Sequence, residues 1–155
     1  MNPKQLCSNL KGVIGFPVTP FNDDHSLDLE GHRKNVRYML EQPMCAVVAA
    51  GGTGELYSLS PDEVRRIVEV TIDEVRGRVP VIAGVGFAGG LTKLLASQAA
   101  ECGADGVLAF PPYYPNAEMD GLLDYYASIA ESSLSLIHIS EPTRQEAISY
   151  AVFCL

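Results

Sequence analysis

The sequence has no tryptophan, few basic residues and only four cysteines among 155 residues. Eleven Lys and Arg against 19 Asp and Glu give a net charge of -8, which excludes the basic surface that nucleic-acid binding needs. The cysteines have no CxxC spacing, so we expect neither a zinc site nor a redox pair but reduced thiols in a cytoplasmic protein. No apolar run approaches the roughly 20 residues that cross a bilayer, and no signal peptide is recognisable. We therefore expect no nucleic-acid partner and no membrane.

Short apolar segments alternate with amphipathic ones along the chain. The expected strands are residues 12–21, 45–50, 79–86 and 106–114, and the expected helices are residues 27–41, 60–75, 91–102 and 119–130. Uncharged strands alternating with helices predict an α/β fold with a parallel sheet buried on both faces. Periodicity alone does not distinguish a doubly wound sheet from a barrel. Four such units of about 30 residues would make half of a (β/α)8 barrel.

The run Gly51–Glu55 follows the second expected strand and holds three glycines and Thr53. A helix start is predicted at Ser60, because Glu63 stands three residues further on, as in a capping box. The run therefore lies at the carboxyl end of a strand, where α/β proteins commonly bind ligands. Taken alone, the run is more typical of a simple tight turn between strand and helix than of a ligand site.

Several runs in one order carry a resemblance to a known family. They are GFPVTPF (residues 15–21), GGTGE (51–55), VPVIAGVG (79–86) and PPYYP (111–115). Together they resemble the dihydrodipicolinate synthase and N-acetylneuraminate lyase superfamily, and within it most closely the 5-dehydro-4-deoxyglucarate dehydratases. The resemblance implies that residues 1–133 form the N-terminal half, (βα)4, of a TIM (β/α)8 barrel.

The resemblance also implies a chemistry. Members of the superfamily are class I lyases, in which a lysine forms a Schiff base with a 2-oxo acid, and they need no metal or organic cofactor. It places Gly51, Gly52 and Thr53 at the substrate carboxylate and Tyr114 in the proton-relay region. The implied whole enzyme is a homo-oligomer, a tetramer. Dihydrodipicolinate synthase remains an alternative, although it usually carries a second threonine where this chain has Gly52.

The sequence departs from the superfamily in two respects. The implied Schiff-base lysine lies on a sixth strand, beyond the four strands expected here. No lysine of this chain lies at the carboxyl end of an expected strand; the four are Lys4, Lys11, Lys34 and Lys93. We therefore expect the chain alone to be inactive. Residues 134–155 resemble a translated sequencing adapter, and we interpret them as a foreign and disordered tail.

The sequence allows further interpretations of single residues and of the protein class. Thr19, between two prolines, could face the ligand or could only stabilise a turn. His25 and His32 have no carboxylate or cysteine at ligand spacing, so we expect both at the surface.

Two alternatives from other classes are a complete, non-catalytic flavodoxin-like module that binds an anion at Gly51–Glu55, and a half-barrel interaction protein that pairs with its own copy.

Overall fold

The computed structural model describes residues 6, 8–112, 118–133, 136–140 and 150–153. Four strands and four helices alternate in it. They are β1 (Val13–Gly15), α2 (Leu29–Met39), β2 (Met44–Ala49), α3 (Pro61–Val75), β3 (Val81–Val85), α4 (Gly89–Cys102), β4 (Gly106–Ala109) and α5 (Met119–Ser133). The predicted α/β alternation is confirmed. Strands β1, β3 and β4 are shorter than the apolar runs that predicted them, whereas β2 has the predicted length and begins one residue earlier.

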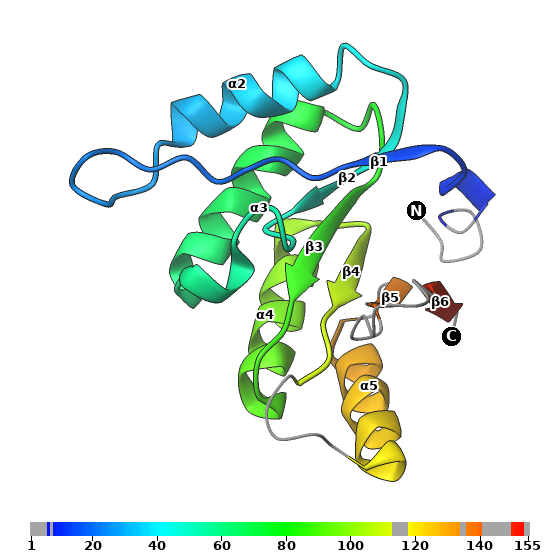
Figure 1. Cartoon of the computed structure of the whole chain (residues 1–155). Coiled ribbons are helices and arrows are strands. Elements are labelled where there is room, and N and C mark those ends of the chain that lie inside the picture. Colours follow the sequence, from blue (N-terminus) through cyan, green and yellow to red (C-terminus); the bar gives the residue numbers. More distant parts are fainter. Residues whose placement is uncertain (1–5, 7, 113–117, 134–135, 141–149, 154–155) are drawn as a thin grey trace, which may run out of the picture.

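The strands lie side by side in the order of the sequence, and each is parallel to the next. Helices α2, α3 and α4 follow one side of this curved sheet (Figure 1). A flavodoxin-like sheet would instead have the strand order 2-1-3-4-5, with helices on both faces. The topology therefore excludes the flavodoxin-like alternative and confirms four units of a barrel.

Helix termini are set by the residues that the sequence indicated. Ser60 accepts a hydrogen bond from the amide of Glu63 at 3.3 Å, and the Glu63 carboxylate accepts one from the Ser60 amide at 2.8 Å. This capping box fixes the start of α3 because it satisfies amides that have no partner within the helix. Gly103 ends α4 with a φ of 90°, a left-handed conformation that glycine adopts readily.

Strands β3 and β4 are buried on both faces, as their uncharged sequences predicted, and so are the last four residues of β2, whereas Val13 in β1 is 61% exposed. One cluster packs strand residues such as Val47, Ala83 and Val107 together with the helices. A second cluster on the opposite face contains the alternate strand residues, with flanking apolar side chains: Ala46, Val48, Ile82, Leu108, Leu10, Ile14 and Phe110. This alternation follows from the two-residue period of a strand. The parallel pairing places the carboxyl ends of β2, β3 and β4 in one row.

Two further strands lie in the segment expected to be a tail. Strand β5 (Leu136–Ser140) pairs in parallel with β4, and β6 (Tyr150–Phe153) pairs antiparallel with β5. The pairing of β5 satisfies backbone groups at the edge of β4 that would otherwise be free. The foreign origin and the disorder of residues 134–155 stay predictions.

Candidate functional site

The loop between β2 and α3 has an unusual backbone. Ala50 and Glu55, which bracket it, have φ values of 51° and 57°, in the left-handed region that non-glycine residues seldom enter. The amide of Glu55 donates to the Gly52 carbonyl at 3.1 Å, and that of Leu56 donates to the Gly51 carbonyl at 3.3 Å. Such strained conformations persist only where the surroundings enforce them, and they cluster at ligand sites.

The three glycines of the loop have different roles. A Cβ at Gly51 would lie 3.0 Å from the side chains of Phe16 and Val48, and one at Gly54 would lie 3.2 Å from the carbonyl of Pro17. Both positions are therefore fitted closely against their neighbours. A Cβ at Gly52 would meet nothing within 4 Å. Neither packing nor φ requires glycine at position 52. The missing side chain therefore leaves the Gly52 backbone accessible from the surrounding open space.

Gly52 and Thr53 are exposed. Among the residues that the structure describes, none accepts a hydrogen bond from the amide of Gly52 or Thr53. Successive backbone amides in a turn form a concave site that favours anions, and the Thr53 hydroxyl adds a further donor. The predicted residues Gly51, Gly52 and Thr53 thus lie together at the carboxyl end of β2, with the chemistry to bind a carboxylate.

Thr19 supports this loop through a buried hydrogen bond. Its side chain is only 6% exposed, and its hydroxyl donates to the Gly54 carbonyl at 2.7 Å. The two residues are 35 positions apart in the sequence, so no local pattern could predict this contact. Of the two roles that the sequence left open, the structure shows the supporting one, in which Thr19 fixes the loop rather than facing open space.

An aromatic cluster that sequence reasoning missed lies beside the loop. The ring of Tyr57 packs edge-on against Phe87 at 5.1 Å and Phe110 at 6.0 Å between ring centroids, and Tyr57 remains 46% exposed. Phe87 follows β3 with a φ of 84°, a strained value for a bulky residue. The three rings follow three successive strands, which only the sheet order brings together.

A buried hydroxyl pair ties the next two strand ends to their helices. The Thr92 hydroxyl donates to the Gly86 carbonyl at 2.7 Å, and the Tyr125 hydroxyl donates to the Phe110 carbonyl at 3.0 Å. The two hydroxyl oxygens lie 3.0 Å apart. Burial raises the pKa of Tyr125 above its ordinary value, so its proton stays available for the bond that holds the end of β4.

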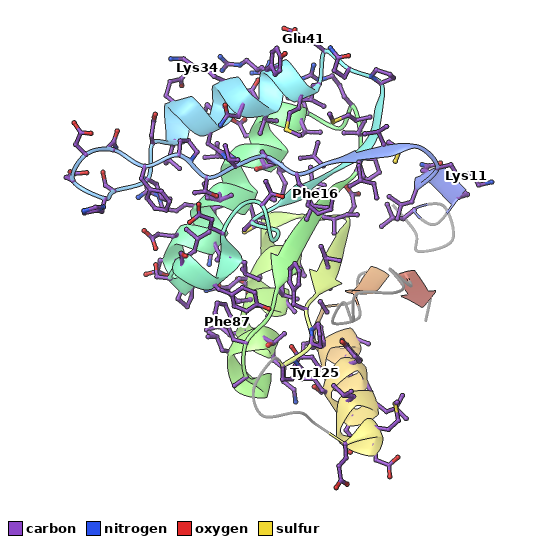
Figure 2. The ribbon with its side chains drawn as sticks, viewed as in Figure 1. Lys11, Phe16, Lys34, Glu41, Phe87 and Tyr125 are labelled. Atoms are coloured by element: carbon purple, nitrogen blue, oxygen red, sulfur yellow. The ribbon has the colours of Figure 1, made fainter. Side chains whose placement is uncertain are left out.

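The remaining predicted site residues lie elsewhere. Tyr114 and Lys4 fall outside the described residues. Lys11 precedes β1 at the amino end of the sheet, and Lys34 and Lys93 are exposed on α2 and α4. Figure 2 shows Lys11 and Lys34 at the periphery, apart from Phe87 and Tyr125. No lysine side chain in the described part of the chain lies at the carboxyl end of a strand.

Within the described residues, no three His, Cys, Asp or Glu side chains gather as a metal ion would require. Over the same residues, every helix is too short or too polar to cross a bilayer.

His32 is buried, so the prediction that it lies at the surface is wrong, whereas His25 is exposed as predicted. Nδ1 of His32 lies 3.3 Å from the Val18 carbonyl oxygen, and Nε2 of His32 lies 2.9 Å from Oγ1 of Thr71. A lone polar residue in a helix gave no sign of partners 14 and 39 positions away. Burial lowers the pKa of His32 below its ordinary value, and the neighbouring charge of Arg33 lowers it further.

This burial predicts a pH dependence of stability. The folded chain binds fewer protons at His32 than the unfolded chain, in which the pKa is about 6.5. The free energy of unfolding should therefore keep the contribution of His32 above about pH 6.5 and lose it as the pH falls, by at most about 1.4 kcal/mol per pH unit. Urea unfolding of the wild type and of His32→Asn between pH 5 and 8 isolates the effect, since all other groups are shared. Parallel pH profiles would contradict it.

The fold and the loop together define a class: half of a parallel (β/α)8 barrel with a glycine-rich turn at the carboxyl end of its second strand. The sequence matches the dihydrodipicolinate synthetase family over residues 9–147, most of its length. The chain therefore belongs to the dihydrodipicolinate synthetase family. The match continues past residue 134, where the sequence predicts the tail to begin.

Two individual relatives share about 40% of their aligned residues with this chain. The chain is 41% identical over 133 residues to a Bradyrhizobium sp. protein named "Probable 5-dehydro-4-deoxyglucarate dehydratase", covering 85% of this chain and 42% of that protein. A Streptomyces griseus protein of the same name is 41% identical over 136 residues, covering 86% of this chain and 42% of the relative. The chain thus spans less than half the length of these relatives.

A solved structure gives the same result for the fold. The dihydrodipicolinate synthase from Acinetobacter baumannii, complexed with pyruvate, superposes with a TM-score of 0.80 at 32% identity. The superposition covers 84% of this chain and 45% of the solved chain. This confirms the prediction that four βα units correspond to about half of a TIM barrel.

Proposed function

We propose that this chain is the N-terminal half of a Schiff-base-forming lyase, in which the loop of Gly51, Gly52 and Thr53 binds the carboxylate of a 2-oxo sugar acid. The parent reaction would be the dehydration and decarboxylation of 5-dehydro-4-deoxyglucarate. The names of the relatives at about 40% identity support this substrate. The single observation that carries the proposal is the pair of unused amides beside the Thr53 hydroxyl, in open space at the end of β2.

The proposed chemistry divides between binding and covalent catalysis. In a class I lyase an amine condenses with the C2 carbonyl, water leaves, and the resulting protonated imine withdraws electrons from the neighbouring carbon. The loop of this chain would hold the carboxylate so that C2 faces the amine. We propose that the amine belongs to the remainder of a family barrel and that this chain alone is inactive, with Tyr114 as a proton-relay residue.

The wider setting of the enzyme is also part of the proposal. We place the whole enzyme in the cytoplasm as a homo-oligomer, a tetramer, with a small 2-oxo acid as its substrate and no nucleic acid or membrane as a partner. Dihydrodipicolinate synthase is the second candidate, favoured by the solved structures of that name. Both candidates share a 2-oxo acid carboxylate, so the loop has the same task in each.

Binding of pyruvate to the isolated chain tests the proposal. In a titration followed by NMR, the amide signals of Gly52 and Thr53 should shift with pyruvate. Thr53→Val should weaken binding about ten- to hundredfold, because a hydrogen bond to a charged group contributes about 1.5–3 kcal/mol. Thr53→Ser keeps the hydroxyl and should bind as the wild type does.

Acetone serves as the matched ligand control, because it has the carbonyl group without the carboxylate. It should leave the two amide signals unshifted at the concentrations at which pyruvate shifts them. Equal shifts with both compounds, or equal affinity of the wild type and Thr53→Val for pyruvate, would contradict a carboxylate-binding loop.

A further inference from the structure

The carboxylate loop is attached to the body of the protein through residues that precede it by more than thirty positions. The Thr19 hydroxyl donates to Gly54 at 2.7 Å. Thr19 lies on the irregular segment after β1, which no ladder of sheet hydrogen bonds holds. The position of the loop therefore depends on what fixes the backbone at Val18 and Thr19.

His32 is the side chain that contacts this backbone. The imidazole, 0% exposed, lies between the Val18 carbonyl on one side and Thr71 on the other. The Thr71 hydroxyl, equally buried, also lies 2.7 Å from the Ile67 carbonyl, one turn earlier in α3. The buried ring thus connects the segment below the loop to the interior of α3.

A neutral imidazole carries one ring proton, so only one of the two ring nitrogens of His32 can donate a hydrogen bond. A carbonyl oxygen only accepts, so the tautomer that uses the Val18 contact carries its proton on Nδ1. Its Nε2 then accepts, and the single proton of the Thr71 hydroxyl is divided between Nε2 and the Ile67 carbonyl. Because Val18 and Thr19 share a rigid peptide plane, a hydrogen bond to this carbonyl also orients the backbone of Thr19.

We propose that His32 is a positioning residue for the carboxylate loop: by holding the Val18 carbonyl it fixes Thr19, whose hydroxyl holds Gly54 and so places the donors of Gly52 and Thr53. The inference rests on the proposed function, because it assigns His32 a role in the binding of the same 2-oxo acid. His32 does not itself touch the ligand. Its effect passes through one peptide group and one hydroxyl.

Two substitutions separate the contacts of the ring. The amide nitrogen of an asparagine corresponds in position to Nδ1 and that of a glutamine to Nε2. His32→Asn should keep the bond to Val18 and bind pyruvate within about twofold of the wild type. His32→Gln keeps only the Thr71 contact and should bind about three- to tenfold more weakly, the range for one lost hydrogen bond.

A double-mutant cycle tests the route through Thr19. Thr19→Val removes the hydroxyl that holds Gly54 and should weaken pyruvate binding by a similar factor. In that background His32→Gln should cause no further loss, because its effect has no remaining path to the loop. Hydrogen exchange at the amides of Glu55 and Leu56, which close the loop, should accelerate in His32→Gln and not in His32→Asn, without any ligand present.

The results of these experiments decide whether His32 positions the loop. Equal weakening by both His32 variants, equal binding by all variants, or additive losses in the cycle would overturn the positioning role, since a merely structural histidine predicts no difference between Asn and Gln beyond stability. If the wild type fails to bind pyruvate, the proposed function fails. In that case the exchange rates at Glu55 and Leu56 still show whether His32 controls the loop.

Discussion

Gly84→Ala is expected to lower the free energy of unfolding by about 3 kcal/mol, the largest effect of any glycine substitution in the described part of the chain. Gly84 lies in β3 directly beyond the paired residues Ala49 and Ala83. A Cβ there would overlap the carbonyl oxygen of Ala50 and lie 2.8 Å from its carbonyl carbon. Two adjacent strands cannot separate without losing their ladder, and overpacking of this kind typically costs 1–3 kcal/mol and occasionally more.

The same substitution should disturb the loop. The displaced atoms belong to Ala50, which starts the loop in a left-handed conformation, and a Cβ at Gly84 would also lie 3.1 Å from Cα of Gly51. Chemical denaturation measures the stability, and a pyruvate titration of the remaining folded protein measures the loop. We expect both to worsen in Gly84→Ala.

Gly121→Ala is the matched control, because it adds the same methyl group where nothing lies within 4 Å. Gly121 is exposed on α5, so alanine there should stabilise the chain by about 0.5–1 kcal/mol through its higher helix propensity. A Gly84→Ala protein as stable as the wild type would show that β2 and β3 are further apart than the structure places them.

Local signals explain why most of the fold could be predicted. The start of α3 was encoded within four residues by Ser60 and Glu63, and the end of α4 by a single glycine, Gly103. Both depend only on contacts within one helical turn. The choice between a barrel and a doubly wound sheet depends on strand order, which local patterns do not contain, so periodicity left it open and the family resemblance decided it.

The site was predictable only in part, for a related reason. The glycines of Gly51–Glu55 identified the loop, but no local pattern shows which glycines are closely packed. Only the packing shows that Gly52 is open while Gly84 leaves no room for a side chain against Ala50. The supports of the loop, Thr19 and His32, act across 35 and 14 positions. Contacts at such distances follow from tertiary packing, and a single sequence carries no local trace of them.

Reduction with borohydride in the presence of pyruvate is expected to produce no site-specific adduct on this chain. A Schiff base forms when an unprotonated amine attacks the C2 carbonyl and water leaves, and borohydride then converts the imine to a stable secondary amine that mass spectrometry detects. Lys11, Lys34 and Lys93 are exposed and lie away from the carboxylate loop.

The decisive comparison is between the wild type and Thr53→Val. A slow background reaction at exposed lysines does not depend on the loop, so both proteins should show the same low level of reduction, spread over several lysines in a peptide map. A full-length protein of the family that holds the Schiff-base lysine provides the positive control and should be modified at one residue. Modification of one lysine of this chain that disappears in Thr53→Val would show that the loop already faces its own amine, and the proposal that the nucleophile lies in the remainder of the barrel would then be wrong.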